Sequence, residues 1–247
     1  MSEEKVYKSR PMRTDYYHPE NNPHGKLFAP VNIIIPYHGN YNGITKLLTS
    51  IFETVRKNNY QINLIDDCSP NKKYGESLKK VGGLLLTRND MQKGFAYCIN
   101  TAIKKSIFPL VCVLQSDVVV SGDWLSQMIQ TLNENESSMV SALTNNPLST
   151  NPNIKANKNE FKNNYILNDE PLSLHCFLTR TELFEKIGYF KESEFYIENK
   201  DIEFFQKMQL NNSKQVVCGK AWVEHKGRGT FERYDKNKKI QKLINNT

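Results

Sequence analysis

Residues 110–125 read LVCVLQSDVVVSGDWL, and this stretch indicates the class of fold. Its first part, residues 110–114, is a short Val-rich apolar run, which is typical of a strand buried on both faces. Asp117 follows this strand, and a Gly-Asp pair then predicts a turn and an N-cap for a helix over residues 124–132. A carboxylate at the C-terminal end of such a strand can bind a hard cation, or it can simply cap a turn.

The chain before this stretch alternates between strand-like and helix-like segments. We predict strands at residues 31–35, 62–65, 83–86 and 110–114, and helices at residues 44–57, 74–80, 94–107 and 124–132. Such alternation predicts an α/β fold with a mostly parallel central sheet and helices on both faces. A polar residue follows each strand: His38, Asp67, Arg88 and Asp117. We expect these residues to converge at one edge of the sheet, because parallel strands place their carboxyl ends together.

The rest of the chain is less regular. Residues 144–171 are rich in Asn, Lys and Pro and predict a long loop or irregular insertion. Beyond it we predict a strand at 172–178, helices at 181–187 and 203–210, and short strands at 216–217 and 221–223. Residues 1–30 predict an arm without its own core, and residues 233–247 a basic tail. The domain between them, residues 31–232, divides into residues 31–125 and residues 126–232.

Composition limits the class of protein. A chain of 247 residues suits one large α/β domain, and it contains no apolar run near the roughly 20 residues that span a bilayer. The N-terminus lacks the apolar core of a signal peptide, so we expect a cytoplasmic protein. Five cysteines without a C-x-x-C pair support neither a disulfide framework nor a zinc site. A net charge of +7 favours anionic partners, although a solvated Lys-rich surface is an equally simple interpretation.

Five stretches, in this order, resemble the family-2 glycosyltransferases of the GT-A fold. They are VNIIIPYHGN, LIDDCSP, RNDMQKGFAYCINTAI, VLQSDVVVSGDWL, and EFYIENKDIEFFQKM followed by VEHKGRG. The resemblance covers residues 31 to about 230, and the third and fourth stretches look most like the rhamnosyltransferase-like branch. Each stretch is a weak signal by itself, but five in order are hard to produce by chance.

The resemblance implies a set of residues that hold a nucleotide-sugar. This set contains Pro36, Tyr37, Asp67, Arg88, Asn89, Lys93, Gly94 and Ser116. Asp67 would accept a hydrogen bond from an imide N–H of the base, which favours uracil or thymine over purines. The alternatives are a turn at the strand end for the Asp66-Asp67 pair and a solvated charge for Lys93. Asn100 could serve the site, or make a structural hydrogen bond, which is the commoner fate of a polar residue on an apolar helix face.

The resemblance also implies metal ligands and a catalytic base. Asp117 and His225 match the metal-binding residues, although Ser116 stands where another acid often occurs. A divalent ion there, Mn²⁺ or Mg²⁺, would bridge the diphosphate of the donor. Asp201 matches the general base, although Lys200 replaces the usual Glu beside it. Asp201 could instead only cap its helix, and Glu198 and Glu203 are rival carboxylates.

The function that follows is an inverting transfer of a sugar from a UDP- or dTDP-sugar to a hydroxyl of a saccharide or glycolipid, as in polysaccharide biosynthesis. The main alternative is an inactive nucleotide-sugar-binding module, because Ser116 and Lys200 each replace an acid. A nucleic-acid-binding domain ranks last, since no interleaved aromatic and basic motif is present. Residues 233–242 could touch an anionic membrane, although a solvated helix is the simpler state.

Overall fold

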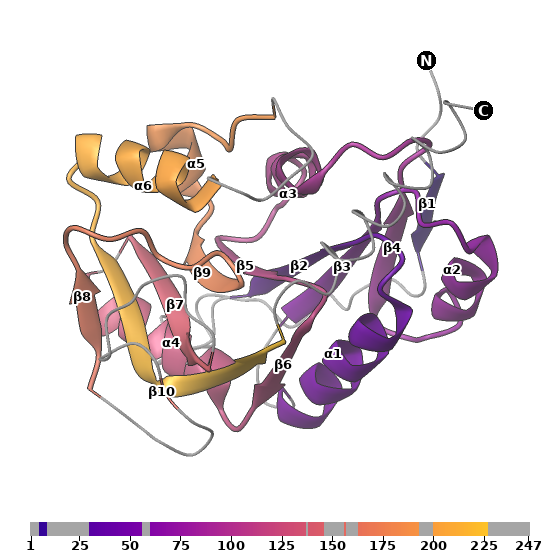
Figure 1. Cartoon of the computed structure of the whole chain (residues 1–247), viewed down its shortest axis with the longest axis horizontal. Helices are drawn as coiled ribbons and strands as arrows, with labels where there is room; N and C mark the ends of the chain where they lie inside the picture. The colour runs from indigo at the N-terminus through magenta and orange to yellow at the C-terminus, as the bar shows by residue number, and fades with distance from the viewer. Residues whose placement is uncertain are drawn as a thin grey trace, which may run out of the picture.

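The computed structural model describes residues 5–8, 30–55, 60–136, 138–145, 156, 163–192 and 200–226; for residues 5–8 and Asp201 it describes the backbone alone. The described strands join one sheet in the order β1-β4-β3-β2-β5-β9-β7-β10-β6, with β8 paired to β10 (Figure 1). Helices cover both faces of this sheet. The predicted α/β class with a central sheet between helices is therefore confirmed.

The first half of the sheet is parallel. It contains β2 (Val31–Tyr37), β3 (Tyr60–Asp66), β4 (Leu84–Arg88) and β5 (Leu110–Leu114). The chain moves outward from β2 to β3 and β4, and then returns to place β5 on the other side of β2. The loops at the carboxyl ends of β2 and β5 therefore diverge, and this switch point is where open α/β sheets usually bind their ligands.

The second half of the sheet is mixed. It contains β6 (Val118–Ser121), β7 (Met139–Thr144), β8 (Tyr165–Leu167), β9 (Cys176–Arg180) and β10 (Gln215–His225). Strand β9 lies antiparallel between β5 and β7, while β10 runs parallel to β7 and antiparallel to β6 and β8. The sequence analysis assigned no strand to β6 or β7. The two short strands expected near the C-terminus form one strand, β10, whose register with β7 shifts between Cys218 and Trp222.

The helices divide into two sets, one on each face. The first set is α1 (Tyr41–Thr54), α2 (Lys72–Leu78) and α4 (Trp124–Glu134), and the second is α3 (Phe95–Lys104), α5 (Glu182–Ile187) and α6 (Lys200–Leu210). Along β2, Ile33 and Ile35 join the core of the first set and Ile34 joins that of the second. Successive strand residues point to opposite faces, which explains why the central strands are apolar throughout.

The structure tests the predicted N-cap at Asp123 and part of the predicted N-terminal arm. Asp123 is the N-cap residue of α4, as expected, but its side chain makes no capping hydrogen bond within the described region. Residues 5–8 of the arm form β1 (Lys5–Lys8), which pairs antiparallel with β4. The tail and most of the insertion lie outside the described residues, so the predictions for them stay predictions. No helix in the described part of the chain is long and apolar enough to span a membrane.

Candidate active site

Strands β2, β3, β4 and β5 end at the same edge of the sheet (Figure 1), and each is followed by polar residues. Backbone hydrogen bonds tie the neighbouring ends together. The Asp67 N–H donates to the Tyr37 carbonyl, and the Asn89 N–H donates to the Asp66 carbonyl, each at 2.9 Å. The strand-end residues expected to converge thus share one edge of the sheet.

Asp117 and His225 form the centre of the candidate site. Asp117 lies between β5 and β6, while His225 ends β10 and pairs with Val118 of β6. The Asp117 Oδ1 and His225 Nε2 atoms are 3.6 Å apart, and the Lys226 N–H donates to the Asp117 carbonyl at 3.3 Å. The Asp117 side chain is largely buried. The structure therefore places side by side the two residues that the resemblance implies as metal ligands.

The donor atoms of this pair suit a divalent cation. Carboxylate oxygen and imidazole nitrogen are both common ligands of such ions. Two ligands that each lie about 2.1 Å from one ion can be at most roughly 4.2 Å apart, so the observed separation of 3.6 Å is compatible. Within the described ranges, no group of three or more His, Cys, Asp and Glu side chains is arranged to hold a metal ion. A cation bound to Asp117 and His225 would need its other ligands from substrate and water.

The turn that carries Asp117 is fixed against the start of α1. The Asn40 Nδ2 atom donates to the Ser116 carbonyl at 3.1 Å and to the Ser116 Oγ at 3.3 Å. A Cβ atom on Gly43 would lie only 2.4 Å from the same carbonyl and 2.2 Å from Asn40 Nδ2. Glycine is therefore required at this position, and the contact joins β2 to β5 across the switch point.

His175 belongs to the site although the sequence analysis did not identify it. Its carbonyl accepts a hydrogen bond from the Gln115 N–H at 2.9 Å, which places it beside the turn that carries Asp117. Its ring lies nearly parallel to the His225 ring, with 5.3 Å between centroids and 13° between planes. Burial is the main cause that lowers the pKa of His175 to about 3, and the nearby His225 contributes less. The imidazole of His175 is therefore neutral at pH 7. A histidine within an apolar run was its only sequence signal.

Asp67 organises the loop between β4 and α3. Its Oδ1 atom accepts hydrogen bonds from Asn89 Nδ2 and the Lys93 N–H, and its Oδ2 atom accepts one from the Gly94 N–H, each at 2.8 Å. The His38 Nδ1 atom lies 2.8 Å from the Asp67 carbonyl oxygen. The structure thus brings together four predicted nucleotide-binding residues, Asp67, Asn89, Lys93 and Gly94, through contacts within the protein.

Arg88 is engaged by its neighbours rather than directed toward open solvent. Its Nη1 atom forms a short ion pair with the buried Asp66 carboxylate, and its Nη2 atom donates to the Ser69 carbonyl at 2.8 Å. The Ser69 N–H in turn donates to Asp66 Oδ1 at 2.8 Å. Arg88 therefore has a structural role in this geometry, and its predicted role at the nucleotide stays a prediction.

The remaining predicted nucleotide-binding side chains lie near this edge. Tyr37 is buried in the core beside Ile33 and Ile35, and burial together with Asp66 raises its pKa. Pro36, also buried, precedes it in β2. The Lys93 Nζ atom is 5.4 Å from the centroid of the Tyr97 ring and 3.9 Å from Asp90 Oδ1.

Asp201 lies in the first turn of α6, and its side chain is outside the described part of the structure. Its neighbour Lys200 is buried, donates to the Lys191 carbonyl at 2.8 Å and lies 3.7 Å from Glu203. Lys207 lies 3.5 Å from the same glutamate. Two lysines thus hold Glu203, which favours a structural role for this rival carboxylate; Glu198 is not among the described residues.

Asn100 connects α3 to the segment before α6. Its Nδ2 atom donates to the Phe190 carbonyl at 2.8 Å and to Glu192 Oε1 at 2.7 Å, and its Oδ1 atom accepts from the Phe190 N–H at 3.1 Å. The side chain is buried. Asn100 therefore makes structural hydrogen bonds, as one of the two interpretations of the sequence predicted.

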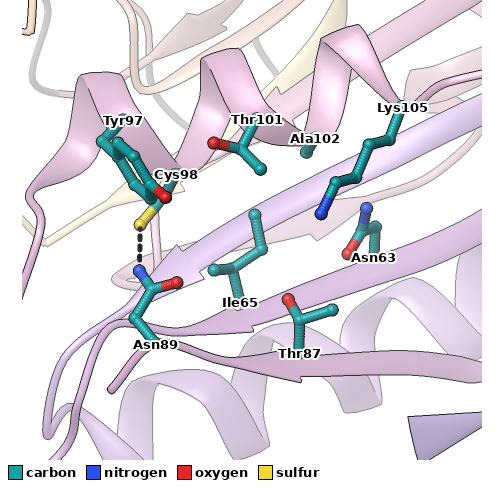
Figure 2. A pocket seen from close by; sticks show the side chains of 9 residues that line it. All are labelled: Asn63, Ile65, Thr87, Asn89, Tyr97, Cys98, Thr101, Ala102 and Lys105. Atoms are coloured by element: carbon teal, nitrogen blue, oxygen red, sulfur yellow. Dashed lines mark hydrogen bonds between the residues drawn. The ribbon is translucent and has the colours of Figure 1, made fainter. Parts of the chain in front are cut away.

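A small pocket lies between α3 and the sheet, next to Asn89 (Figure 2). Side chains from the sheet, including Asn63 and Thr87, face α3 across it, and Asn89 Nδ2 donates to the Cys98 thiol at 3.4 Å. Its volume of about 20 Å³ is sufficient for about one water molecule. This pocket is therefore too small to hold a nucleotide.

Comparison with solved structures assigns the fold. The chain aligns with the crystal structure of GalNAc-T7 with UDP, GalNAc and Mn²⁺ at a TM-score of 0.68 and 14% identity, covering 80% of this chain and 44% of that one. It aligns with *S. aureus* TarS 1-349 at a TM-score of 0.61 and 21% identity, covering 82% and 62%. The chain thus spans less than two thirds of either structure. No curated protein matches the sequence.

The chain shares the GT-A fold with these structures. The sequence matches the description "Glycosyl transferase family 2" over residues 32–222, and the chain belongs to this family.

Proposed function

We propose that this glycosyltransferase transfers a sugar from a UDP- or dTDP-sugar to a hydroxyl of a saccharide or glycolipid, with inversion at the anomeric carbon. The observation that carries the proposal is the Asp117–His225 pair, 3.6 Å apart, beside the switch point between β2 and β5. A structural relative with UDP, GalNAc and Mn²⁺ supports the donor class. The likeness of two sequence stretches to the rhamnosyltransferase-like branch is part of the same proposal.

The hydrogen bonds of the Asp67 carboxylate support the proposal that the donor carries uracil or thymine. A carboxylate offers about four lone-pair sites, and the protein donates three hydrogen bonds to this one. Oδ2 accepts only one of them, from Gly94, so it has capacity for the imide N–H of a base. The contacts to Asn89, Lys93 and Gly94 hold the carboxylate in place before the nucleotide arrives, which lowers the entropic cost of binding.

Asp117 and His225 would hold a divalent cation, Mn²⁺ or Mg²⁺. When bound, such a cation offsets the negative charge that develops on the leaving diphosphate. Burial of Asp117 would strengthen this interaction, because the local dielectric is lower than that of water. Ser116 lies beside Asp117 in the same turn and would contact the donor through its hydroxyl.

Asp201 is the proposed base. It would accept the proton of the acceptor hydroxyl as that oxygen attacks the anomeric carbon from the face opposite the diphosphate. Its position in the first turn of α6 supports this role, because the N-terminal end of a helix favours a carboxylate in its ionised form. The transition state would resemble an oxocarbenium ion, as in other glycosyl transfer chemistry.

Two variants test the assignment. Asp117→Ala should abolish the cation-dependent part of UDP binding, measured by calorimetric titration with and without Mn²⁺. Asp201→Asn should lower turnover by about 10²–10⁴-fold with nucleotide binding largely kept, because a general base contributes roughly this factor. Unchanged titrations for the first variant, or full turnover in the second, would refute the corresponding role. The anomeric configuration of the product, read by NMR, tests inversion.

The second candidate is an inactive nucleotide-sugar-binding module. Lys200 favours it, since this buried lysine occupies the position of the family's usual acid. A panel of nucleotide-sugars assayed for transfer and for hydrolysis without acceptor separates the two functions. Binding without turnover of any donor would favour the module. Contact of the basic tail with a membrane is a separate proposal, and co-sedimentation with anionic vesicles tests it.

A further inference from the structure

His175 is a buried polar side chain whose hydrogen-bonding capacity is unused. It is only 2% exposed, and neither Nδ1 nor Nε2 has a hydrogen-bond partner among the described residues. A neutral imidazole has one donor and one acceptor nitrogen, and leaving both unsatisfied in the interior lowers stability. An aromatic ring without nitrogen could stack on His225 without this penalty.

The surroundings of His175 indicate where a partner would come from. Its neighbours in the chain, Leu174 and Cys176, are buried in the core. Its carbonyl is fixed by the Gln115 N–H, and its ring stacks against His225, the residue that faces Asp117. The polar region beside the ring is therefore the proposed cation and diphosphate site.

We propose that His175 is a binding residue of this site: a ring nitrogen contacts the diphosphate of a donor held at Asp117 and His225. The inference rests on the proposed function and adds a residue to it. A buried polar group without a partner in a native protein calls for an explanation, and a bound ion or ligand, an ordered water or a catalytic role can supply one. The bound ligand would satisfy a nitrogen that the empty protein leaves unsatisfied, so His175 would lower the stability of the free protein and raise its affinity for the donor.

The test replaces His175 by residues without polar side-chain atoms. We expect His175→Phe to bind Mn²⁺ with UDP at least about tenfold more weakly than the wild type, which corresponds to about 1.4 kcal/mol. Its melting temperature without ligand should equal or exceed that of the wild type, because the unsatisfied nitrogens are gone. Should the larger Phe ring prevent folding, His175→Leu serves the same test, and His175→Gln should restore part of the affinity.

Titrations with Mn²⁺ alone, UDP alone and both together locate the contact. A loss of affinity that requires UDP supports contact with the diphosphate. A loss of the same size with Mn²⁺ alone would contradict it, because His175 does not complete a metal-binding group with Asp117 and His225. Asn32→Leu is the matched control, since Asn32 Oδ1 is also buried without a partner within the described region but lies near the opposite end of β2. Asn32→Leu should leave the affinity unchanged.

Two results overturn the inference. Wild-type affinity for Mn²⁺ and UDP in both folded nonpolar variants of His175 would show that the ring nitrogens contact no ligand. That result would leave the proposed function intact, because the wild type would still bind. A wild-type protein that binds neither UDP nor dTDP, with or without Mn²⁺, would overturn the inference and the proposed function together.

Discussion

Replacing Arg88 by methionine should destabilise the protein. Measuring this loss distinguishes an arginine that holds the fold together from one that binds nucleotide. The Asp66 side chain is 2% exposed and that of Arg88 is 24% exposed. The guanidinium pairs with Asp66 and also donates to the Ser69 carbonyl. Methionine would fill the volume of the stem but would leave the Asp66 carboxylate buried without its cation.

The magnitude follows from this burial. Removing one partner of a buried ion pair costs about 3–5 kcal/mol, because the other charge stays uncompensated. Arg88 is partly exposed, so water can reach the vacated position, and we expect a value near the lower limit, about 3 kcal/mol. In a domain of this size, 1 kcal/mol shifts the melting temperature by about 2–4 °C. The variant should therefore melt about 6–12 °C below the wild type.

Thermal and urea denaturation of Arg88→Met measure this effect. Lys79→Met is the control, because its partner Glu76 is exposed; losing this pair leaves no buried charge and should cost less than about 1 kcal/mol. Adding Asp66→Asn to Arg88→Met should recover part of the loss by removing the buried charge. An unchanged melting temperature combined with weaker UDP binding would refute the reasoning, since it would make Arg88 a nucleotide ligand.

Two further substitutions test how the site is held. Gly43→Ala should lower the free energy of unfolding by about 1–3 kcal/mol and weaken Mn²⁺-dependent UDP binding, because the added Cβ would lie 2.4 Å from the Ser116 carbonyl. Gly82→Ala is the control: its Cβ would have no atom within 4 Å, so denaturation and titration should both be unchanged. Lys200→Glu introduces the acid that is usual in the family at this position. It should destabilise the protein by about 3 kcal/mol or more in urea denaturation, because it places a buried carboxylate beside the partly exposed carboxylate of Glu203. Wild-type stability in Lys200→Glu would show that the lysine contributes nothing at α6.

The sequence predicted the first half of the fold because its signals are local. The apolar runs of β2 and β5 are buried on both faces, so their hydrophobicity is continuous and easy to recognise. Strand β7, MVSALT, mixes apolar and polar residues in a short segment, and its Ser141 is buried only because other strands surround it. Strand β6 follows β5 after three residues and depends on pairing with β10, which begins 94 positions after β6 ends.

The site residues were predicted from the resemblance and from their chemical type, and neither reveals which group a side chain contacts. Arg88 and Asp67 have the charges expected of nucleotide ligands, yet the structure shows both engaged by protein groups 19 to 27 positions away in the chain. His175, in contrast, was not predicted from the sequence and lies at the site in the structure. Nothing in its sequence context separates it from a core residue, and its importance depends on burial and missing partners, which require a three-dimensional structure.

The polar groups at the sheet edge therefore divide into two sets with different physical roles. Asp66, Arg88 and Asp67 have their charges largely satisfied inside the protein, and they fix the loops on which a ligand would lie. Asp117, His225 and the ring of His175 meet at the other side of the switch point. A rigid first set lowers the entropic cost of ordering the site, so that binding energy can stabilise the reacting groups. Variants of Asp66 and Arg88 should consequently lose stability, and variants of Asp67 both stability and nucleotide affinity. Variants of the second set should lose affinity in a protein that still folds.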